Sequence, residues 1–298
     1  MNNSRKYDCI IVGAGPGGLQ AAIHLARYNR SVILFDSGGG RTRHALHLEN
    51  YLGLKNTTGK SLVDTGFEQI QSFGVTTVRK DVTRVTGKKD NFEVLTRDDA
   101  CYSRFVIAAS GTSENIPGIH HMNRFFGRSF FTCIDCDGYR MRNKKALVIG
   151  NSLSAARNAL AVKEMFSDQV GLILAGVDIP DDIKELLEED GIRVTSGVVA
   201  ELVGDEELEA VILQDGSRYE CEVVLSGFGY KLNDNYLSEL PLDRDGQEKK
   251  ILVNRRNESS VSGLYITGAL APMNSQAIIA AGQGAVAAID INKRLLEI

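Results

Sequence analysis

The apolar positions near the start of the chain follow the order strand, turn, helix, strand. Residues 7–12 are almost continuously apolar, which predicts a buried parallel strand, and a glycine-rich turn follows at once. Residues 19–28 have the apolar spacing of a helix, and residues 31–35 form a second apolar run that ends at Asp36. This order predicts a β–α–β unit of the nucleotide-binding type.

Glycines and one acid give this unit the chemistry of a dinucleotide site. Gly13 allows the tight turn, Gly15 allows the backbone to approach a pyrophosphate, and Gly18 allows close packing of helix on strand. The helix N-terminus offers N–H groups and the positive end of its dipole to the phosphates. Asp36 follows the turn at about the spacing of an acid that binds the adenosine ribose. A glycine motif alone is often an ordinary turn, but here strand, helix and acid are all present.

The remaining apolar segments predict an α/β chain with a second nucleotide-binding unit. Residues 145–149 predict a strand, Gly150 to Ala155 its turn, 156–166 a helix and 170–174 the next strand. Pro117-Gly118 indicates a crossover between two domains. Other helices are expected at 62–73, 181–190 and 276–296, strands of a small sheet at 75–85 and 92–96, and further strands at 104–109, 194–202, 209–214, 223–226 and 263–268.

Composition narrows the class of protein. The chain has 298 residues, of which 43% are hydrophobic, enough for two domains with their own cores. Its net charge of −4 argues against nucleic acid and anionic membrane surfaces as partners. No apolar run is long enough to span a bilayer, and the polar start of the chain does not resemble a signal peptide. We therefore expect a cytoplasmic protein whose cysteines stay reduced unless catalysis oxidises them.

A pair of cysteines carries the second candidate chemistry. Cys133 and Cys136 lie at the spacing that closes a small disulfide at a helix start, poised for exchange, and Asp137 follows directly. The alternative is a zinc site, which needs four ligands and has only the histidines at 120–121 nearby. A purely structural disulfide is not expected in a chain without secretory features, so we expect redox chemistry and no metal. The other cysteines, Cys9, Cys101 and Cys221, stand alone.

The chain resembles the low-molecular-weight thioredoxin reductases over nearly its whole length. The matching motifs are the first glycine turn, Glu49–Gly53, Ser110-Gly111, Cys133–Gly138, the second nucleotide unit and Gly268–Gly284. The resemblance implies two Rossmann-like, three-layer nucleotide-binding domains of α/β class, the second inserted in the first. It implies FAD in a discontinuous domain near 1–115 and 246–298, a rotating central redox domain near 116–245, and a homodimer.

The resemblance also implies roles for single residues. Cys136 would be the sulfur next to the flavin, Cys133 would attack the disulfide of thioredoxin, and Asp137 would move protons to and from the pair. An alternative for Asp137 is an acid at a helix start, satisfied by backbone N–H groups. The residues expected around FAD are Gly13, Gly15, Pro16, Gly17, Gly18, Asp36, Ser37, Arg41, Asn50, Val82, Gly111, Gly268, Gln276 and Ala277.

Three departures from the family pattern bear on the electron donor. Ser152 stands where the second nucleotide turn of the family has glycine, and Leu174 to Asp178 contains no Arg or Lys for the NADPH phosphate. Asp178 would instead repel a phosphate. Ala269 replaces a family Asp that bonds a ribityl hydroxyl of FAD, a loss of about 1 kcal/mol. The chain is therefore most similar to the divergent branch that lacks NADPH motifs, the ferredoxin-dependent flavin thioredoxin reductases and the deeply rooted type.

These observations leave three functions open. The first is a flavin-dependent reductase of a thioredoxin-like protein disulfide, with a donor other than NADPH, for which ferredoxin is our hypothesis. The second is a dithiol oxidase that returns electrons to oxygen, and the third is a non-catalytic flavin-bound sensor. Ferredoxins are typically acidic, so docking would need a local basic patch. The candidates for that patch are Arg41, Arg43, His44, Arg140, Arg142, Lys144 and Lys145.

Overall fold

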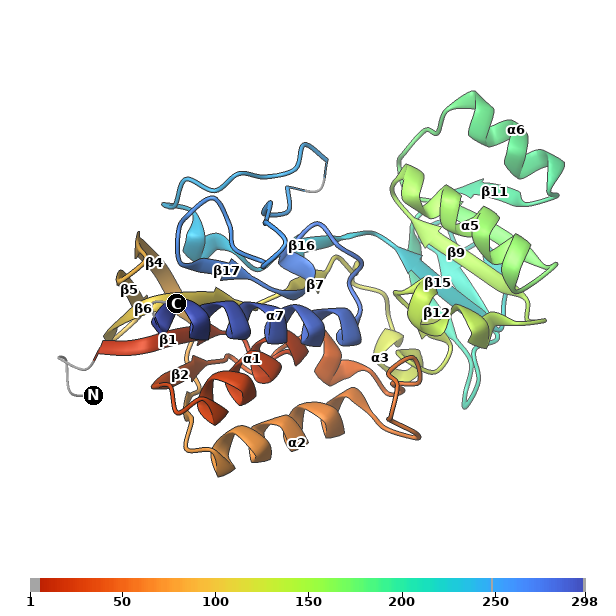
Figure 1. Cartoon of the computed structure of the whole chain (residues 1–298). Coiled ribbons are helices and arrows are strands. Elements are labelled where there is room, and N and C mark those ends of the chain that lie inside the picture. The colour runs from red at the N-terminus through yellow and green to blue at the C-terminus, as the bar shows by residue number, and fades with distance from the viewer. Residues whose placement is uncertain (1–5, 248, 297–298) are drawn as a thin grey trace. The chain divides into compact units, whose positions relative to one another are not determined.

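Strand β1 (Lys6–Val12) lies inside a sheet, paired in parallel with β2 (Val32–Phe35) on one side and β6 (Ala100–Ala108) on the other. The structure is a computed structural model that describes residues 6–247 and 249–296 (Figure 1). The whole sheet has seven strands in the order β3-β2-β1-β6-β5-β4, with β17 paired to β6. Its further strands are β3 (Thr76–Val78), β4 (Val82–Lys88), β5 (Asn91–Thr96) and β17 (Leu264–Ile266).

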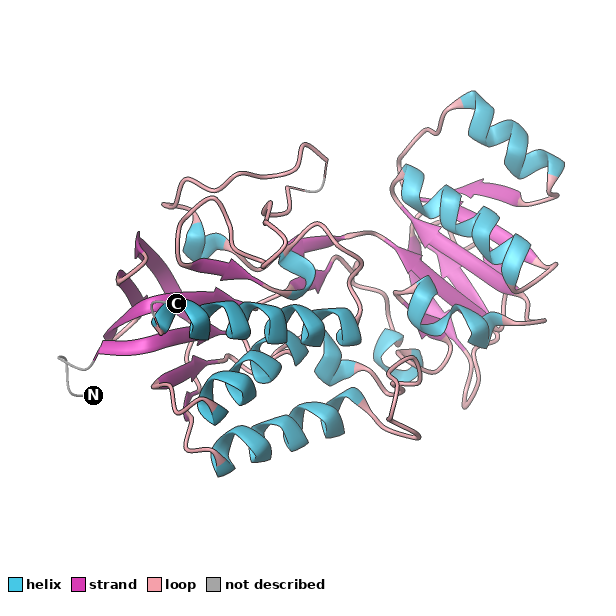
Figure 2. Ribbon diagram, in the orientation of Figure 1, coloured by secondary structure: helices cyan, strands magenta, loops and turns pink. Residues whose placement is uncertain are grey.

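Helices and loops cover the two faces of this sheet (Figure 2). One face packs against α1, α2 and α7 in a buried cluster that includes Leu25, Leu34 and Ile291. The other face is covered by the segment after residue 231, where Tyr236 packs in the same cluster as Ile10. The helical elements of this unit are α1 (Pro16–Arg27), η1 (Arg41–His44), α2 (Gly59–Ser72), η3 (Asn235–Leu237), η4 (Gly268–Leu270) and α7 (Ala277–Leu295).

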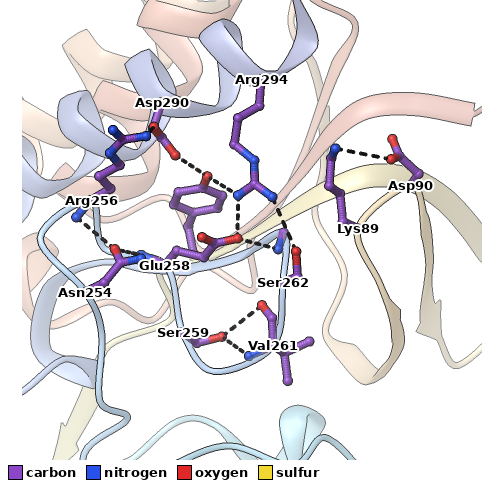
Figure 3. A network of polar contacts seen from close by, with 12 residues as sticks. Lys89, Asp90, Asn254, Arg256, Glu258, Ser259, Val261, Ser262, Asp290 and Arg294 are labelled. Carbon is purple, nitrogen blue, oxygen red and sulfur yellow. Dashed lines mark hydrogen bonds and ion pairs between the residues drawn. The ribbon is translucent and has the colours of Figure 1, made fainter. Parts of the chain in front are cut away.

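A polar network fixes the C-terminal half of α7 to the rest of the unit (Figure 3). Tyr265, which is fully buried, donates to Asp290 Oδ2 at 2.6 Å and accepts from Arg294 Nη1 at 2.9 Å. Arg256 donates to Asp290 Oδ1 at 2.7 Å, and Arg294 also donates to Glu258. Each carboxylate is therefore paired with a guanidinium, as buried charges require. The network sets the position of α7 along the sheet.

The second unit contains a parallel sheet of five strands in the order β11-β10-β9-β15-β8 and a separate antiparallel sheet, β12-β13-β14. Its first elements are α3 (Met122–Phe125), β8 (Phe130–Phe131), α4 (Ile134–Asp137), η2 (Gly138–Met141), β9 (Ala146–Gly150), α5 (Leu153–Met165) and β10 (Val170–Leu174). The others are α6 (Asp181–Glu189), β11 (Arg193–Ser196), β12 (Val199–Val203), β13 (Ala210–Leu213), β14 (Arg218–Glu220) and β15 (Val223–Gly227).

The α/β class with two Rossmann-like units is confirmed, but the boundaries differ from those expected. The compact units are 1–113 with 231–298, and 114–230, rather than 1–115 with 246–298, and 116–245. Residues 231–245 belong to the first unit because Tyr236 and Leu237 are buried in its core. The two crossovers, β7 (Thr112–Glu114) and β16 (Tyr230–Leu232), pair as a two-stranded sheet.

Two expected strands are each split in the structure. The run 75–85 forms β3, at one edge of the large sheet, and β4, at its other end, so no separate small sheet exists among the described residues of this region. The run 194–202 forms β11 and β12, which belong to different sheets. Alternation of apolar positions cannot show where a chain leaves one sheet edge and joins another. None of the helices formed by the described residues is long and apolar enough to cross a membrane.

Candidate cofactor site and redox disulfide

The turn after β1 excludes side chains at two of its glycines. Gly13 has φ +105°, and a Cβ there would lie 2.4 Å from the carbonyl oxygen of Ala109. A Cβ on Gly18 would lie 1.9 Å from the carbonyl oxygen of Gly13. Both contacts are with backbone, which cannot move aside as a flexible side chain would. These glycines are needed for the turn itself and for the packing of α1 on β1.

Gly15 differs from its neighbours because the space in front of it is open. It caps α1 in an extended conformation, φ −71° and ψ 177°, and, having no side chain, leaves the first N–H groups of the helix without a cap bond from that position. The nearest atom to a Cβ built on Gly15 is 3.9 Å away. Pro16 occupies the first helical position, where its missing N–H is not required. An anionic group can therefore approach the backbone at Gly15 and meet the positive end of α1.

Asp36 is placed to form hydrogen bonds with both the glycine turn and a ligand. Its Oδ1 accepts from the N–H of Ala14 at 2.9 Å, which joins the end of β2 to the turn after β1. Its Oδ2 accepts no hydrogen bond from another described residue, and the side chain is half-buried next to the exposed Ser37. That second oxygen suits a hydroxyl donor such as those of an adenosine ribose.

Helix α7 adds a second N-terminus beside that of α1. A Cβ on Gly284 would lie 2.1 Å from the carbonyl oxygen of Gly17, so the two helices touch backbone to backbone. Near their C-terminal ends, Arg30 Nε donates to Asn292 Oδ1 at 2.8 Å, which shows that the helices run parallel. The side chain of Gln276, the residue before α7, makes no capping bond to the helix. Both helices therefore present their positive ends at the same edge of the sheet.

Residues expected around FAD from distant parts of the sequence meet at this edge. Asn50 Nδ2 donates to Gln276 Oε1 at 2.8 Å, next to Ala277 at the start of α7. Gly111 has φ +63°, and no described atom beyond its two chain neighbours lies within 4 Å of a Cβ built there, so this side of its backbone is open to a ligand. Arg41 Nη1 donates to Thr112 Oγ1 at 3.2 Å, which brings the basic loop to the same segment.

Val82 is the exception among the expected residues. It is the first residue of β4, half-buried, and packs against the core cluster that contains Phe35 and Val85. Thr96 is its partner across the β4–β5 pair. Nothing in this packing brings Val82 to the glycine turn, and its contact with FAD stays a prediction.

Gln283 was not expected from the sequence and lies at the turn where the family acid is missing. Gly268 has φ +71°, and its N–H donates to Gln283 Oε1 at 2.7 Å, next to Ala269. Gln283 is 5% exposed, and its Nε2 donates to the sulfur of Met273, a weak acceptor. It is the only polar side chain between residues 277 and 289, which is the signal that could have singled it out.

The cysteine pair forms a disulfide in the second unit. Cys133 lies just after β8 and caps α4, and its Sγ is bonded to that of Cys136. The N–H of Cys136 donates to Cys133 Sγ at 3.1 Å. Both cysteines are partly exposed, and Phe166 packs so closely against the next glycine, Gly138, that a Cβ there would lie 2.5 Å from its ring. The pair is therefore partly accessible, and the chain directly after it is closely packed.

Asp137 lies beside a cation. Its Oδ1 is 4.0 Å from Arg140 Nε, and both side chains are about one quarter exposed, at 24% and 25%. Arg140 also stacks over the ring of Tyr139, with its Cζ 5.1 Å from the ring centroid. The N–H of Asp137 donates to the carbonyl oxygen of Cys133 at 3.0 Å, which closes the short helix. Asp137 is near enough to the pair in the chain to serve it, and its proton-transfer role stays a prediction.

The three free cysteines are poor candidates for thiol chemistry. All are buried, and desolvation raises the pKa of the Cys9 and Cys101 thiols above the ordinary value. Burial also raises the pKa of Cys221 to about 12. Since the thiolate is the reactive form, these residues are unreactive near neutral pH. The described residues contain no cluster of three or more His, Cys, Asp or Glu that could hold a metal ion.

The second nucleotide unit keeps the close strand–helix packing of such a unit, with a serine in its turn and an acid after its second strand. A Cβ on Gly150 would lie 2.5 Å from the Cβ of Ala155, so strand and helix pack as closely as in the first unit. Ser152 stands at the helix cap in an extended conformation and makes no cap bond. After β10, Asp178 accepts from the N–H of Ile179 and lies 3.0 Å from Lys184 Nζ, whose hydrogen bond and charge lower the pKa of that carboxyl.

Comparison with known proteins agrees with this architecture. The model of the pyridine nucleotide-disulphide oxidoreductase family matches residues 7–285. An alkyl hydroperoxide reductase component of Staphylococcus epidermidis is 29% identical over 97% of this chain, which spans 59% of that relative's length. The thioredoxin reductase of Helicobacter pylori is 28% identical, with 95% of this chain and 97% of the relative covered.

The solved structure of the thioredoxin reductase from Streptococcus pyogenes has the same fold, with a TM-score of 0.91 over the whole of both chains at 24% identity. The glycine turn, the open backbone at Gly15 and Gly111, and the second oxygen of Asp36 fit the dinucleotide FAD. The chain therefore belongs to the pyridine nucleotide-disulphide oxidoreductase family, and its fold is that of a thioredoxin reductase.

Proposed function

We propose that the protein reduces the disulfide of a thioredoxin-like partner through its Cys133–Cys136 pair. The observation that carries the proposal is the partly exposed disulfide at the start of α4 in a chain whose other three cysteines are buried and unreactive. FAD, when bound, supplies the two-electron redox centre that reduces this pair. Gly15 and the N-termini of α1 and α7 would hold its pyrophosphate, and Asp36 its ribose.

The two cysteines have different parts in the exchange. Once the pair is reduced, the Cys136 N–H that donates to Cys133 Sγ stabilises negative charge on that sulfur. Cys133 is therefore the thiolate that attacks one sulfur of the partner's disulfide and releases the other as a thiolate. Cys136 then attacks Cys133 Sγ, which frees the reduced partner and restores the Cys133–Cys136 disulfide. Asp137 would accept the proton that Cys136 loses in the second step.

The second part of the proposal is that the electron donor is not NADPH. A bound NADPH would need close approach of its pyrophosphate at residue 152, and Ser152 places a side chain there. It would need cations for the ribose phosphate, and Lys184 in α6, the first Lys or Arg after β10, is shared by Asp178 and Asp181 at 3.0 Å each. Each missing charge-assisted bond costs about 1.5–3 kcal/mol, so two or three losses weaken binding by orders of magnitude.

A one-electron carrier such as ferredoxin is the donor that we propose. The structure removes two residues from the basic patch expected to dock this carrier. Arg43 pairs with Asp64 at 2.7 Å, and Lys145 pairs with Glu220 at 3.1 Å. Lys145 also precedes β9, whereas Cys133 follows β8, and both strands are parallel to β15. Lys145 and the redox pair therefore lie at opposite edges of that sheet. Lys144 is adjacent to Lys145 and is excluded with it, which leaves Arg140 and Arg142 in the second unit, and Arg41 and His44 in the first, as separate candidates for docking.

Anaerobic stopped-flow reduction of the bound flavin tests the donor. Reduced ferredoxin should bleach the flavin absorbance rapidly, whereas NADPH and NADH at millimolar concentration should bleach it at least about a thousandfold more slowly, since the lost contacts total about 4 kcal/mol. Rapid bleaching by either nicotinamide would contradict the proposal. Fast bleaching by a small dithiol, with slow bleaching by ferredoxin and rapid reoxidation by oxygen, would instead identify a dithiol oxidase.

We also propose that the protein is a homodimer and that α7 contributes to its interface. Ile278, Val286 and Ile289 are 41%, 41% and 37% exposed on this helix, and their spacing places them along one face. An apolar stripe of this kind is stabilised by covering it, and a two-fold axis lets the stripe cover itself.

The replacement Val286→Glu should convert the dimer to a monomer. A carboxylate in the centre of the stripe would have to be buried unpaired, which raises the dissociation constant by roughly a hundredfold or more. Sedimentation velocity over a concentration series measures the change, with Gln69→Glu on the exposed face of α2 as the control. If the Val286 variant sediments as the unmodified protein does, α7 is not at the interface.

A further inference from the structure

Asn233 makes four hydrogen bonds to one short segment of the first unit. Its N–H donates to the carbonyl oxygen of Gly111 at 2.9 Å, and its Nδ2 donates to that of Ser110 at 3.2 Å. Its Oδ1 accepts from Ser113 Oγ at 2.9 Å, and its carbonyl oxygen accepts from Ser110 Oγ at 2.7 Å. Both the backbone and the side chain of one residue are thus used to hold Ser110–Ser113.

The segment that Asn233 holds contains Gly111, one of the residues expected around FAD. Gly111 has a positive φ and open space before it, and Arg41 donates to Thr112 from the basic loop. Ser110 Oγ also lies 2.9 Å from the hydroxyl of Tyr236, which is 7% exposed in the core. Asn233 and Tyr236 therefore connect the segment that faces the cofactor to a part of the chain more than 120 residues later.

Asn233 also lies where both crossovers leave the first unit. Strand β7 begins at Thr112, within the held segment, and β16 ends at Leu232, one residue before Asn233. Further along the pair, the N–H of Asn115 donates to the carbonyl oxygen of Gly229 at 2.9 Å. The hydrogen bonds of Asn233 are thus the first links in a ladder that joins one crossover to the other.

We propose that Asn233 is a positioning residue that couples the cofactor site to the crossovers, so that FAD bound at Gly111 orders both of them. The inference rests on the proposed contact between FAD and Gly111. A ligand that restrains one segment also restrains whatever is hydrogen-bonded to it, and local opening there becomes less frequent. Without the Asn233 side chain, the bonds to the Ser110 carbonyl oxygen and to Ser113 Oγ are lost while the two backbone bonds remain, so the restraint that passes from residues 110–113 to residues 229–233 is weakened.

Amide hydrogen exchange with and without FAD measures this coupling directly. In the unmodified protein, FAD should slow exchange by about tenfold or more at residues 111–113, at the Asn115 amide and at residues 229–235. In Asn233→Ala, protection at 111–113 should remain while that at 229–235 falls to about twofold or less. The FAD dissociation constant should rise about 5- to 20-fold, the effect of one or two lost hydrogen bonds.

Two further variants separate coupling from general loss of structure. Ser113→Ala removes only the bond to Asn233 Oδ1 and should give an intermediate loss of protection at 229–235. Ser103→Ala removes a buried hydrogen bond of the large sheet, from Ser103 Oγ to the carbonyl oxygen of Phe105, and should leave both the coupling and FAD binding unchanged. The pattern across these variants is one that a merely structural role would not produce.

The experiment distinguishes failure of this inference from failure of the proposed function. A protein that takes up no FAD, judged from its flavin absorbance, would overturn the proposed function and this inference with it. A protein that binds FAD, but whose crossovers are not protected, would overturn the inference alone. Equal protection of both segments in Asn233→Ala would do the same, because the side chain would then not be the link.

Discussion

Replacing Cys136 by serine should abolish reduction of protein disulfides while leaving the fold and the FAD site intact. The pair lies in the second unit, on a short helix whose backbone hydrogen bonds do not need the Cys136 sulfur. The variant cannot form the Cys133–Cys136 disulfide, so no electrons pass from FAD to the partner. We expect turnover to fall at least about a thousandfold, which corresponds to roughly 4 kcal/mol in the barrier. Steady-state reduction of a thioredoxin-like disulfide is the measurement.

The two cysteine variants should differ in what they trap. Cys136→Ser keeps the thiol of Cys133, which accepts the N–H of residue 136 and is the attacking group, so a mixed disulfide with the partner should accumulate. Cys133→Ser should lose activity equally but trap much less partner. Non-reducing electrophoresis followed by mass spectrometry reads out the difference. Equal trapping by both variants would reverse or remove the assigned roles.

A buried cysteine outside the disulfide provides a matched control. Cys101 is 7% exposed in β6, and burial raises the pKa of its thiol. Cys101→Ser should therefore keep turnover and FAD absorbance close to those of the unmodified protein. Full activity in Cys133→Ser or Cys136→Ser, or its loss in Cys101→Ser, would place the thiol chemistry elsewhere.

The parts of the fold that the sequence predicts are those set by local rules. The turn from Gly13 to Gly18 has its geometry because of backbone contacts close to the strand end, and Asp36 returns to that turn through Ala14. The cysteine pair likewise closes over a separation of 3 residues. Residue types and spacings carry this information directly, since these features follow from motifs that are contiguous or nearly so in the chain.

The parts that sequence reasoning missed depend on contacts between distant segments. Asn233 and Tyr236 were expected in the second domain, and only their bonds to Ser110 show that they brace the first. Gln283 becomes a candidate site residue only because the N–H of Gly268 donates to its side chain. Lys145 is a candidate docking cation by its sequence alone, yet it pairs with Glu220. A single sequence contains no signal for such pairings, because the partners follow from packing rather than from local spacing.

Replacing Gly18 or Gly15 by alanine should separate the glycine that the turn needs for its structure from the glycine that it needs for FAD. In Gly18→Ala, the new methyl group would lie 1.9 Å from the carbonyl oxygen of Gly13, so the turn or the helix must shift. Overpacking of this kind costs about 1–3 kcal/mol or more, and the apo-protein should unfold at a lower urea concentration. FAD binding should be lost as well, because the shifted turn no longer presents its N–H groups correctly.

Gly15→Ala should weaken FAD binding without lowering the stability of the apo-protein. Its φ of −71° and ψ of 177° are allowed for alanine, and the nearest atom to the new Cβ is 3.9 Å away, so apo-protein stability should change by less than about 0.5 kcal/mol. The methyl group would nevertheless fill the open space through which a pyrophosphate approaches the backbone. We expect the FAD dissociation constant to rise about a hundredfold, equivalent to roughly 3 kcal/mol.

The decisive comparison is urea unfolding of the apo-proteins beside FAD titrations followed by flavin fluorescence. Gly118→Ala, at an open position with ordinary φ in the second unit, controls for adding a methyl group and should affect neither quantity. If Gly15→Ala binds FAD normally, the cofactor does not approach over Gly15. If it unfolds as easily as Gly18→Ala, the space before Gly15 is not open. Loss of FAD without loss of stability at Gly15 alone would show that this space belongs to the cofactor, because nothing else in the turn needs it.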